Sequence, residues 1–368
     1  MFLINMIHHF KSTLNIKNIN LFGLITVLLI NFSNAQEHKE YYPNGNIKEI
    51  GKLENGNKAG EWKLYYENGK LSRVEQYSNG SGTGEWKYYH ENGKLSDIGA
   101  YKVGDRTGLW KSYHENGQLK QIGKYSNGKH ISEWKWYHKN GQLQQIGEFK
   151  DGNQTGLWKT YHENGQLEQI GKYIDNEVNG EWKTFYDNGK LQKSGRYSRG
   201  KALDEWKFYH KNGKLSGIGK YVDNEVNGEW KTYHENGSVY QIRIWENGKF
   251  MNIISCFDNK GNPLDKGTLL NGNGTAKQYH ENSQLSEIGE YSNGNANGEW
   301  KIYHANGSVY QIRVWENGKF MNIVSCFDNK GNPLDKGTLL NGNGTVNYYH
   351  ENGSLTETKK YKDGLVQE

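Results

Sequence analysis

Histidine is the residue type whose number and spacing in this chain bear most directly on metal chemistry. Nine histidines share one position of a repeated unit: His90, His114, His138, His162, His210, His234, His280, His304 and His350. A zinc site needs several ligands, each about 2 Å from one ion. Residues that recur once every two strands of a sheet stand about 10 Å apart, so we expect no shared metal site. Tyr42, Tyr66 and Tyr186 occupy the same position, and we interpret it as an amphipathic ring that packs beside leucine and tryptophan.

Catalysis would require singular residues that break the repeat, because one active site needs one nucleophile and one base. The singular residues are His130, Ile131, Arg199 and Asp204, and we expect them in loops without catalytic partners. Glycine-rich segments such as 79–82 lack the following helix and the Lys-Ser/Thr pair of a phosphate-binding loop. We therefore predict that the protein is not an enzyme and that it has no catalytic, cofactor-binding or metal-binding residues.

The two cysteines, Cys256 and Cys326, hold equivalent positions in a duplicated segment. Three repeat units separate them, which corresponds to roughly 30 Å at the strand spacing of a sheet. A disulfide needs Cα atoms within about 7 Å, so an intramolecular bond is disfavoured. We interpret both as half-buried small apolar residues, and an intermolecular bridge stays open as the minor alternative.

A fixed period organises the chain. The tryptophans from Trp62 to Trp230 follow one another at intervals of 24 residues, which is typical of a repeat architecture. The repeat positions that we expect to hold the structure together are Trp62, Trp86, Trp110, Trp134, Trp158, Trp182, Trp206, Trp230, Trp300, Tyr89, Tyr113, Tyr137, Tyr161, Gly93, Gly117, Gly141 and Gly165. Repeated residues are poor catalytic candidates, and these positions are therefore assigned to structure.

Each unit reads as a β-hairpin. Two short runs flank an Asn-Gly pair such as Asn92-Gly93, which predicts a two-residue type I′ loop. With that loop, Glu91 faces Lys94, His90 faces Leu95, and Trp86 faces Gly99. Trp86, His90, Leu95, Gly99 and Tyr101 then share one face, and Tyr89, Lys87 and Ile98 share the other. An aromatic ring opposite a glycine covers backbone that the glycine leaves bare.

One hairpin is marginal in water, whereas stacked hairpins bury each other's aromatic rings. The sequence therefore predicts an all-β fold, an extended antiparallel meander or solenoid of stacked hairpin repeats. We count about fourteen units of 24 residues, some of them 22. The first, from His38, has histidine where tryptophan is expected and is interpreted as an atypical capping unit.

The organisation along the chain has three parts. Residues 1–35 carry an apolar run from Leu21 to Phe32 and then Ser33-Asn34-Ala35, which predicts a signal peptide cleaved after Ala35. Residues 36–228 hold the regular 24-residue repeats. Residues 229–368 hold divergent repeats with a 70-residue tandem duplication, in which 237–275 recurs as 307–345 with two differences. There Ile254, Ala276, Val324 and Val346 replace the first-strand tryptophan.

Composition and charge disfavour some classes of binding partner. Of the 368 residues 13% are aromatic, and the net charge of +5 falls to +3 without the two lysines of residues 1–35. A near-balanced charge and an exported chain disfavour nucleic acid, and no polybasic patch supports membrane binding beyond export. Exposed tryptophan or tyrosine would allow stacking on sugar rings, with Trp136 as an extra indole, although core packing is the favoured interpretation.

The motif Gly-x-Trp-x-x-Tyr-x-x-Asn-Gly-x-Leu, followed by Gly-x-Tyr-x-x-Gly, resembles the variant MORN repeat of bacteria. In one unit the matching residues are Gly108, Trp110, Tyr113, Asn116, Gly117, Leu119, Gly123, Tyr125 and Gly128. The resemblance covers about residues 38–364. The chain is also similar to YwqK-like proteins described as toxin–antitoxin antitoxins. The resemblance implies a hairpin array that binds protein, and the antitoxin likeness implies neutralisation of a partner toxin by binding.

We therefore expect a non-enzymatic, exported repeat protein that acts as a protein-binding scaffold, in the periplasm, on the cell surface or secreted. Two alternatives stay open. One is an antitoxin or immunity protein that neutralises a partner toxin by binding it. The other is a cell-surface glycan binder that uses exposed tryptophan or tyrosine.

Overall fold

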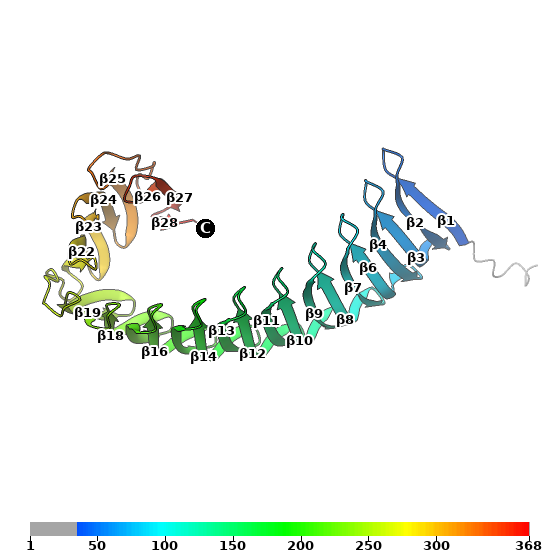
Figure 1. Ribbon diagram of the computed structural model, residues 1–368, viewed down its shortest axis with the longest axis horizontal. Helices are drawn as coiled ribbons and strands as arrows, with labels where there is room; N and C mark the ends of the chain where they lie inside the picture. Colours follow the sequence, from blue (N-terminus) through cyan, green and yellow to red (C-terminus); the bar gives the residue numbers. More distant parts are fainter. Residues whose placement is uncertain (1–34, 368) are drawn as a thin grey trace, which may run out of the picture. The chain divides into compact units, whose positions relative to one another are not determined.

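The computed structural model describes residues 35–367, and all regular elements in that range are β-strands (Figure 1). Among these residues there is no helix long and apolar enough to cross a membrane. The predicted signal peptide lies outside the described residues except for Ala35, the first residue of β1. The prediction of an all-β array of stacked antiparallel hairpins is confirmed.

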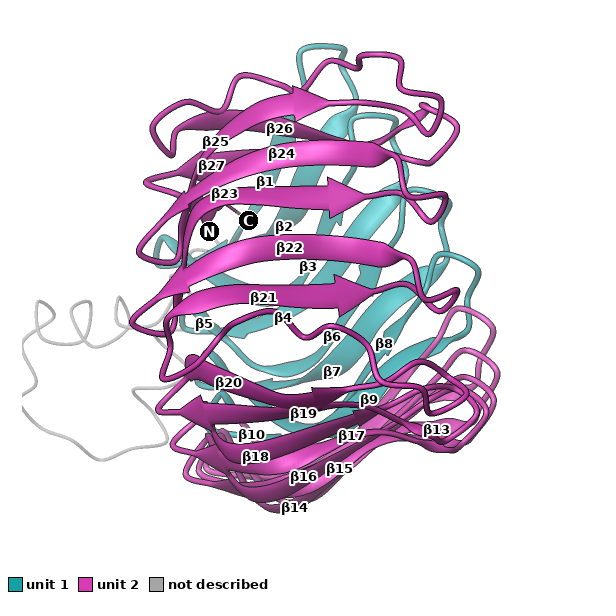
Figure 2. Ribbon diagram, turned by 90° about the vertical axis from the view of Figure 1, so that its left-hand side faces the viewer, with its two compact units in different colours: residues 1–129 teal, residues 130–368 magenta. Residues whose placement is uncertain are grey.

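The chain forms two compact units that meet between Lys129 and His130 (Figure 2). In the first unit the strands pair antiparallel in chain order, each with the next, except that β4 pairs with both β5 and β6. They are β1 (Ala35–Tyr41), β2 (Ile47–Glu54), β3 (Asn57–Tyr65), β4 (Leu71–Ser78), β5 (Ser81–Gly82), β6 (Gly84–Tyr89), β7 (Leu95–Lys102), β8 (Asp105–Tyr113) and β9 (Leu119–Ser126).

The second unit continues the same pattern, in three runs of paired strands. The first run is β10 (Lys129–Tyr137), β11 (Leu143–Lys150), β12 (Asn153–Tyr161), β13 (Leu167–Ile174), β14 (Glu177–Phe185), β15 (Leu191–Ser198), β16 (Lys201–Tyr209), β17 (Leu215–Val222), β18 (Glu225–Tyr233), β19 (Val239–Glu246) and β20 (Lys249–Cys256). The second is β21 (Gly274–Tyr279), β22 (Leu285–Ser292), β23 (Asn295–Tyr303), β24 (Val309–Glu316) and β25 (Lys319–Cys326). The third is β26 (Gly344–Tyr349), β27 (Leu355–Lys362) and β28 (Leu365–Val366).

The predicted register holds in the middle of the hairpin and fails at its loop. Trp86 pairs with Gly99 and Gly84 with Tyr101, as expected. The loop, however, has three residues, because the His90 N–H donates to the Lys94 carbonyl at 2.8 Å. Gly93 adopts φ +85° and follows a type I turn, so this is the three-residue loop with a bulge. Tyr89 therefore pairs with Leu95. A second bulge between Tyr88 and Tyr89 restores the predicted register, so that Tyr88 pairs with Asp97.

This correction also changes the two faces. Leu95 lies opposite Tyr89, on the face away from Trp86, and His90 pairs with Lys94 at the base of the loop. Two-residue type I′ loops do occur, but at the other connection of each repeat. Asn79 and Gly80 have φ values of +48° and +77°, and Ser78 pairs with Ser81 across them.

The duplicated segment interrupts the hairpin pattern. After β20 the chain runs from Phe257 to Asn273 with isolated bridges only, and the same happens after β25. Two of the predicted fourteen units therefore have one strand each. The prediction that Ile254 and Val324 replace the tryptophan is wrong, because a bulge turns them outward and buries Ile253 and Ile323 instead. Ala276 pairs with Gly289 as a residue in the tryptophan position should.

Candidate interaction surface

Aromatic rings follow one another along one face of the stacked hairpins, and we call these rings the aromatic ladder. In the first unit Trp62, Tyr77 and Trp86 follow one another with ring centroids 6.4 and 5.3 Å apart. Tyr101 then lies between Trp86 and Trp110 at 4.3 and 5.3 Å. Contacts at these separations are favourable aromatic pairs, so each hairpin is fixed to the next through its rings.

The repeat tryptophans are held by glycine from the neighbouring hairpin. A Cβ on Gly99 would overlap the indole of Trp110, and Gly51, Gly147, Gly171, Gly195, Gly219 and Gly289 stand in the same relation to the next tryptophan. The sequence predicted that Trp86 covers Gly99 across one hairpin. The ring that covers Gly99 is instead Trp110, whose Nε1–H donates to the Ala100 carbonyl at 3.1 Å. The contact between this glycine and the tryptophan of the next hairpin therefore holds the two hairpins together.

In the second unit the ladder is densest around Trp136. Its ring centroid is 5.8 Å from Trp134 and 5.8 Å from Trp158, and Phe149 packs against Trp158 at 5.1 Å. His130, expected in a loop, lies in β10 with its ring 4.2 Å from Trp134. Trp134 and Trp158 are buried. The rings that face solvent are therefore the half-buried ones of Trp136 and Phe149.

Two other singular residues also differ from expectation, and Arg199 lies in a turn as expected. Ile131 and Asp204 lie in strands β10 and β16, and Asp204 forms an ion pair with Arg196 at 3.7 Å. Arg199 is the first residue of a type I′ turn, with φ +47°. Strand position, an ion pair and a turn explain these three residues in structural terms.

The recurrent histidines form hydrogen bonds between hairpins. His90 Nε2 lies 3.0 Å from the Tyr113 carbonyl, 23 residues ahead in the following hairpin. A carbonyl only accepts, so Nε2 carries the proton and donates. The same bond is formed by His138, His162, His210, His234, His280 and His304. The hydroxyl groups of Tyr42, Tyr66 and Tyr186 replace it, which explains why tyrosine substitutes for histidine here.

The loop asparagine adds a second bond of the same kind. Asn92 Oδ1 accepts from the Lys94 N–H at 2.9 Å and holds its own turn, while Nδ2 donates to the Glu115 carbonyl at 2.9 Å. Asparagine thus serves here for its two hydrogen-bonding groups and not for positive φ. The loops of successive hairpins are thereby tied into one row within each unit.

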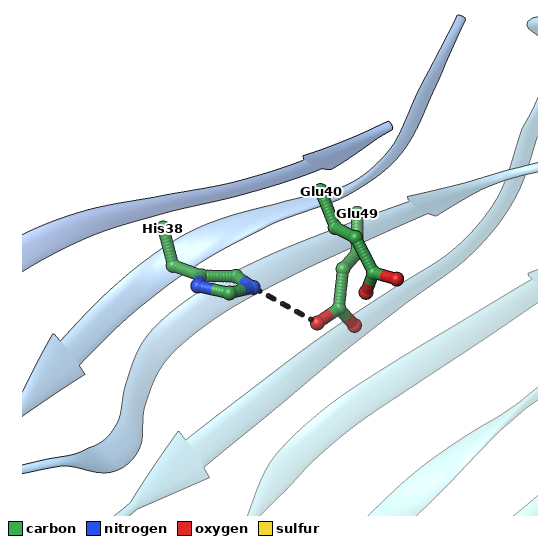
Figure 3. A group of neighbouring side chains, drawn as sticks. All are labelled: His38, Glu40 and Glu49. Carbon is green, nitrogen blue, oxygen red and sulfur yellow. Dashed lines mark ion pairs between the residues drawn. The ribbon is translucent and has the colours of Figure 1, made fainter. Parts of the chain in front are cut away.

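The first two hairpins place charged groups on the ladder face. His38, Glu40 and Glu49 lie with their ligand-type atoms within 4.8 Å of one another, and His38 Nε2 is 3.3 Å from Glu49 Oε1 (Figure 3). Lys58 Nζ lies 3.0 Å from Glu49 Oε2, and Lys48 Nζ lies 2.7 Å from Glu40 Oε1. Each carboxylate is therefore already neutralised by an ammonium group that a metal ion would have to displace.

Glu75 is the singular residue that the sequence reasoning missed. It occupies the glycine position opposite Trp62, with 3% of its surface exposed. Its carboxylate accepts a hydrogen bond from the Tyr77 hydroxyl at 2.8 Å and pairs with Arg73 at 3.2 Å. Burial and the bond to this carboxylate raise the pKa of Tyr77. Aligning the units on their glycines would have revealed Glu75.

The duplicated segment buries a polar group in each copy. Gln241 donates through Nε2 to Cys256 Sγ at 3.2 Å, and Arg243 Nε donates to Gln241 Oε1 at 2.6 Å. Burial lowers the pKa of Arg243 and raises the pKa of Cys256. Both cysteines are free thiols, and they are fully buried where half-burial was expected.

A hollow of about 340 Å³ opens on the first unit between the loops and the ladder face. Its walls include Tyr42, Glu49, Tyr66, Arg73 and Tyr88. It is open to solvent and suits the side chain of a partner better than an enclosed small ligand.

Comparison with known proteins identifies the repeat. The family model described as MORN repeat variant matches residues 37–55, 58–79, 83–102, 106–127, 132–151, 154–175, 178–198, 205–223, 226–249, 273–293, 296–319 and 343–363. These are the twelve two-stranded hairpins, and the two one-stranded units are not matched. No curated protein matches the chain. Similar solved structures include the crystal structures of TcdB2-TccC3 and of TcdB2-TccC3-Cdc42, each 12% identical with a TM-score of 0.16. The chain is covered to 89% and spans 18% and 17% of those chains.

Proposed function

We propose, on the premise that this chain belongs to the MORN repeat variant family, that it is a non-enzymatic scaffold that binds another protein through its ladder face. Repeat arrays offer extended surfaces on which one partner contacts several units at once. The aromatic ladder supplies rigid, half-buried rings with polar tips, and such residues are enriched at the centres of protein interfaces.

The observation that carries the proposal is one variable position within an otherwise repeated unit. It lies two residues after each repeat tryptophan and on the same face. Its occupants are Leu64, Tyr88, Ser112, Trp136, Thr160, Thr184, Phe208 and Thr232. The side chains there differ in size and polarity between most neighbouring hairpins, while the tryptophans do not; Thr160 and Thr184 are identical, and Ser112 and Thr184 are buried. A partner that contacts the half-buried members of this row, such as Tyr88, Trp136 and Phe208, meets a surface that changes along the array, which is how a repetitive sheet gains specificity.

The charged end of the first unit extends the same surface. Glu75 pairs with Arg73 and stands opposite Trp62, and Arg73 lines the hollow together with Tyr88. Mixed charges beside aromatic rings favour a protein partner over a uniformly acidic or basic polymer.

Export is the second part of the proposal. The apolar run from Leu21 to Phe32 and the following Ser33-Asn34-Ala35 support cleavage after Ala35. Amino-terminal sequencing of the protein from envelope and secreted fractions tests this. A first residue of Gln36 supports export, and an intact Met1 in the cytosolic fraction contradicts it.

Partner capture tests the binding role. The full chain, tagged at its carboxyl end and expressed in its own cells, is purified from each fraction and its companions are identified by mass spectrometry. We expect one protein in stoichiometric amount. Recovery of polysaccharide without protein contradicts the proposal and favours a glycan binder, and a partner that is itself toxic narrows the role to an immunity protein.

Two substitutions in β12 separate the ladder face from its reverse. Thr160→Arg adds a bulky charge at the variable position, and Leu157→Arg adds the same side chain on the opposite face, where Leu157 is exposed. We expect Thr160→Arg to weaken capture at least about tenfold, equal to about 1.4 kcal/mol, and Leu157→Arg to leave it unchanged. The reverse result places the partner on the other face, and turnover of a substrate that depends on one residue contradicts the non-enzymatic role.

A further inference from the structure

The three-residue loops of successive hairpins are joined by side-chain hydrogen bonds that run in one direction. At a junction in the second unit, His280 Nε2 lies 2.9 Å from the Tyr303 carbonyl, and Asn282 Nδ2 donates to the Ala305 carbonyl at 2.7 Å. The tryptophan Nε1–H donates the other way, as from Trp300 to the Glu290 carbonyl of the earlier hairpin at 3.1 Å. At the three-residue loops, however, the side-chain donors belong to the earlier hairpin and the carbonyl acceptors to the later one. The array therefore has a donor end and an acceptor end.

The donor end is the hairpin formed by β26 and β27. His350 and Asn352 hold the donor positions there, and Asn352 Oδ1 accepts from the Ser354 N–H at 3.0 Å as in the other loops. No hairpin follows within the described residues, so neither the His350 ring nor Asn352 Nδ2 has the carbonyl that its equivalents have. Strand β28 covers only the far end of β27, where Lys362 pairs with Leu365 and Tyr361 with Val366. The Gln367 N–H donates to the Lys360 carbonyl at 2.8 Å, and no strand of the described part of the chain pairs with the remaining edge from Leu355 to Lys359.

The acceptor end is the hairpin formed by β1 and β2. By position, the carbonyls of Tyr41 and Pro43 are equivalent to those of Tyr65 and Glu67, which accept from Tyr42 and Asn44. No earlier hairpin lies within the described residues to supply donors. Among residues 35–367 only β2 pairs with β1, and an unpaired strand edge is a template for a further strand.

Two apolar side chains are exposed only because these ends are open. Tyr41 is 55% exposed, whereas its equivalents Tyr65 and Tyr89 are half-buried. Leu355 is 55% exposed, whereas its equivalent Leu95 is half-buried. The two ends thus match in the hydrogen bonds of the loops and in apolar surface, whereas Lys359 and His38 hold the positions of the joining glycine and tryptophan.

We propose that the donor end of one copy of this chain binds the acceptor end of a second copy, head to tail, and continues the antiparallel sheet across the junction. His350 donates to the Tyr41 carbonyl of the second copy, Asn352 donates to its Pro43 carbonyl, and Leu355 packs against its Tyr41. Strand addition of this kind uses main-chain hydrogen bonds for affinity and side-chain contacts for specificity.

The register follows from the interior junctions, where Ile98 pairs with Lys111 and Asp97 with Ser112. The equivalent pairs place Thr358 opposite Lys39 and Glu357 opposite Glu40. Both glutamates already have ammonium partners, Lys359 at 3.1 Å and Lys48 at 2.7 Å. The two acidic groups therefore do not repel as bare charges.

The direction of the loop hydrogen bonds favours a second copy of this chain as the binding partner. Two donor ends facing each other would bring donors to donors, and two acceptor ends would leave every carbonyl without a donor. The joined surfaces are different, so the contact is heterologous and one junction leaves both outer ends free for more copies. We expect a mass distribution that grows with concentration.

The experiment uses the full chain purified from its own cells with the tag removed, and measures mass by light scattering across a concentration series. Leu355→Asp and Tyr41→Asp each put a charge in the junction, and each is expected to leave a monomer. Leu340→Asp is the matched control, because Leu340 is 60% exposed in the same unit but belongs to the segment before β26 and not to the edge strand β27. We expect that variant to assemble like the unaltered chain.

Mixing the two blocked variants provides the decisive result. A Leu355→Asp chain keeps its acceptor end and a Tyr41→Asp chain keeps its donor end, so the mixture should form one-to-one dimers and nothing larger. A double change of His350→Phe with Asn352→Asp, which keeps Oδ1 as the turn acceptor, should weaken assembly about tenfold. Circular dichroism and the melting temperature confirm that each variant folds.

Three outcomes overturn the proposal. The unaltered chain stays a monomer at every concentration. One variant blocks assembly while the other does not, which indicates contact between like ends. The control variant loses assembly as completely as Leu355→Asp, which indicates non-specific apolar association.

Discussion

Gly219 in β17 lies directly beneath the indole of Trp230, so that a Cβ on Gly219 would overlap Cδ2, Cε2 and Cγ of that ring. Trp230 Nε1 also donates to the Lys220 carbonyl at 3.2 Å, which fixes the ring over the backbone. The strand offers a natural comparison, because Gly217 lies two residues earlier on the same face. A Cβ on Gly217 would make ordinary contacts, the nearest at 3.7 Å from the Lys231 carbonyl oxygen.

Gly219→Ala should lower the free energy of unfolding by about 1–3 kcal/mol, because the added methyl group displaces a packed ring. Gly217→Ala should change it by less than about 1 kcal/mol in either direction. Guanidinium unfolding followed by tryptophan fluorescence measures both. Equal losses in the two variants would show that the glycines are required by the backbone and not by the indole.

The sequence predicts the strand pairing in the middle of each hairpin well, because side chains alternate between the two faces of a strand. Tryptophan and glycine recur at fixed offsets, and a two-residue period allows one register that pairs Trp86 with Gly99. The loops were assigned to the wrong connection because Asn-Gly suits both a type I′ turn and the αL position of a three-residue loop. Here Asn79-Gly80 forms the first and Asn92-Gly93 the second.

Other features depend on neighbours that one unit does not reveal. The cover of Gly99 by Trp110 and the bond from His90 to the Tyr113 carbonyl are contacts between hairpins. Bulges at Ile254 and Val324 cannot be read from composition, since two adjacent aliphatic residues compete for one inward position. Glu75, by contrast, was visible in an alignment of the chain with itself.

Trp158→Ala should cost about 3–5 kcal/mol, because Trp158 is only 3% exposed and its ring contacts Phe149 and Tyr173. Leu157→Ala is the matched control, since Leu157 is the preceding residue and is 45% exposed. Hydrogen exchange along the array shows whether the loss stays local. A small loss for Trp158→Ala would mean that the tryptophans contribute little to packing and are available to ligands.

His162 tests the hydrogen bond between hairpins separately from ring packing. Its Nε2–H donates to the Phe185 carbonyl at 3.0 Å, and Tyr186 fills the equivalent position with its hydroxyl 2.6 Å from the Tyr209 carbonyl. His162→Phe keeps a ring but removes the donor, and should lower the free energy of unfolding by about 0.5–1.5 kcal/mol.

His162→Tyr should restore most of that loss, because tyrosine already serves as the donor elsewhere in the array. Thermal and guanidinium unfolding of the three proteins give the comparison. If the phenylalanine and tyrosine variants are equally stable, the position contributes ring packing alone.

Alkaline pH should destabilise the protein through its buried tyrosines. Burial, followed by the nearby carboxylate of Glu287, raises the pKa of Tyr291 to about 12, and burial followed by Asp265 raises the pKa of Tyr279 to about 12. Burial also raises the pKa values of the ladder residues Tyr173, Tyr197 and Tyr221. An unfolded tyrosine ionises near pH 10, so the unfolded chain loses these protons first as pH rises.

The tyrosine contribution to stability is therefore fully present below about pH 10 and is lost as pH rises from about 10 towards 12. Guanidinium unfolding at several pH values measures the slope. Tyr291→Phe keeps the ring between Phe250 and Trp300, whose centroids lie 5.1 and 5.2 Å away, and removes one ionisation. That variant should match the unaltered chain near neutral pH and lose stability less steeply above pH 10. An unchanged slope would mean that Tyr291 ionises at the same pH in the folded and unfolded states.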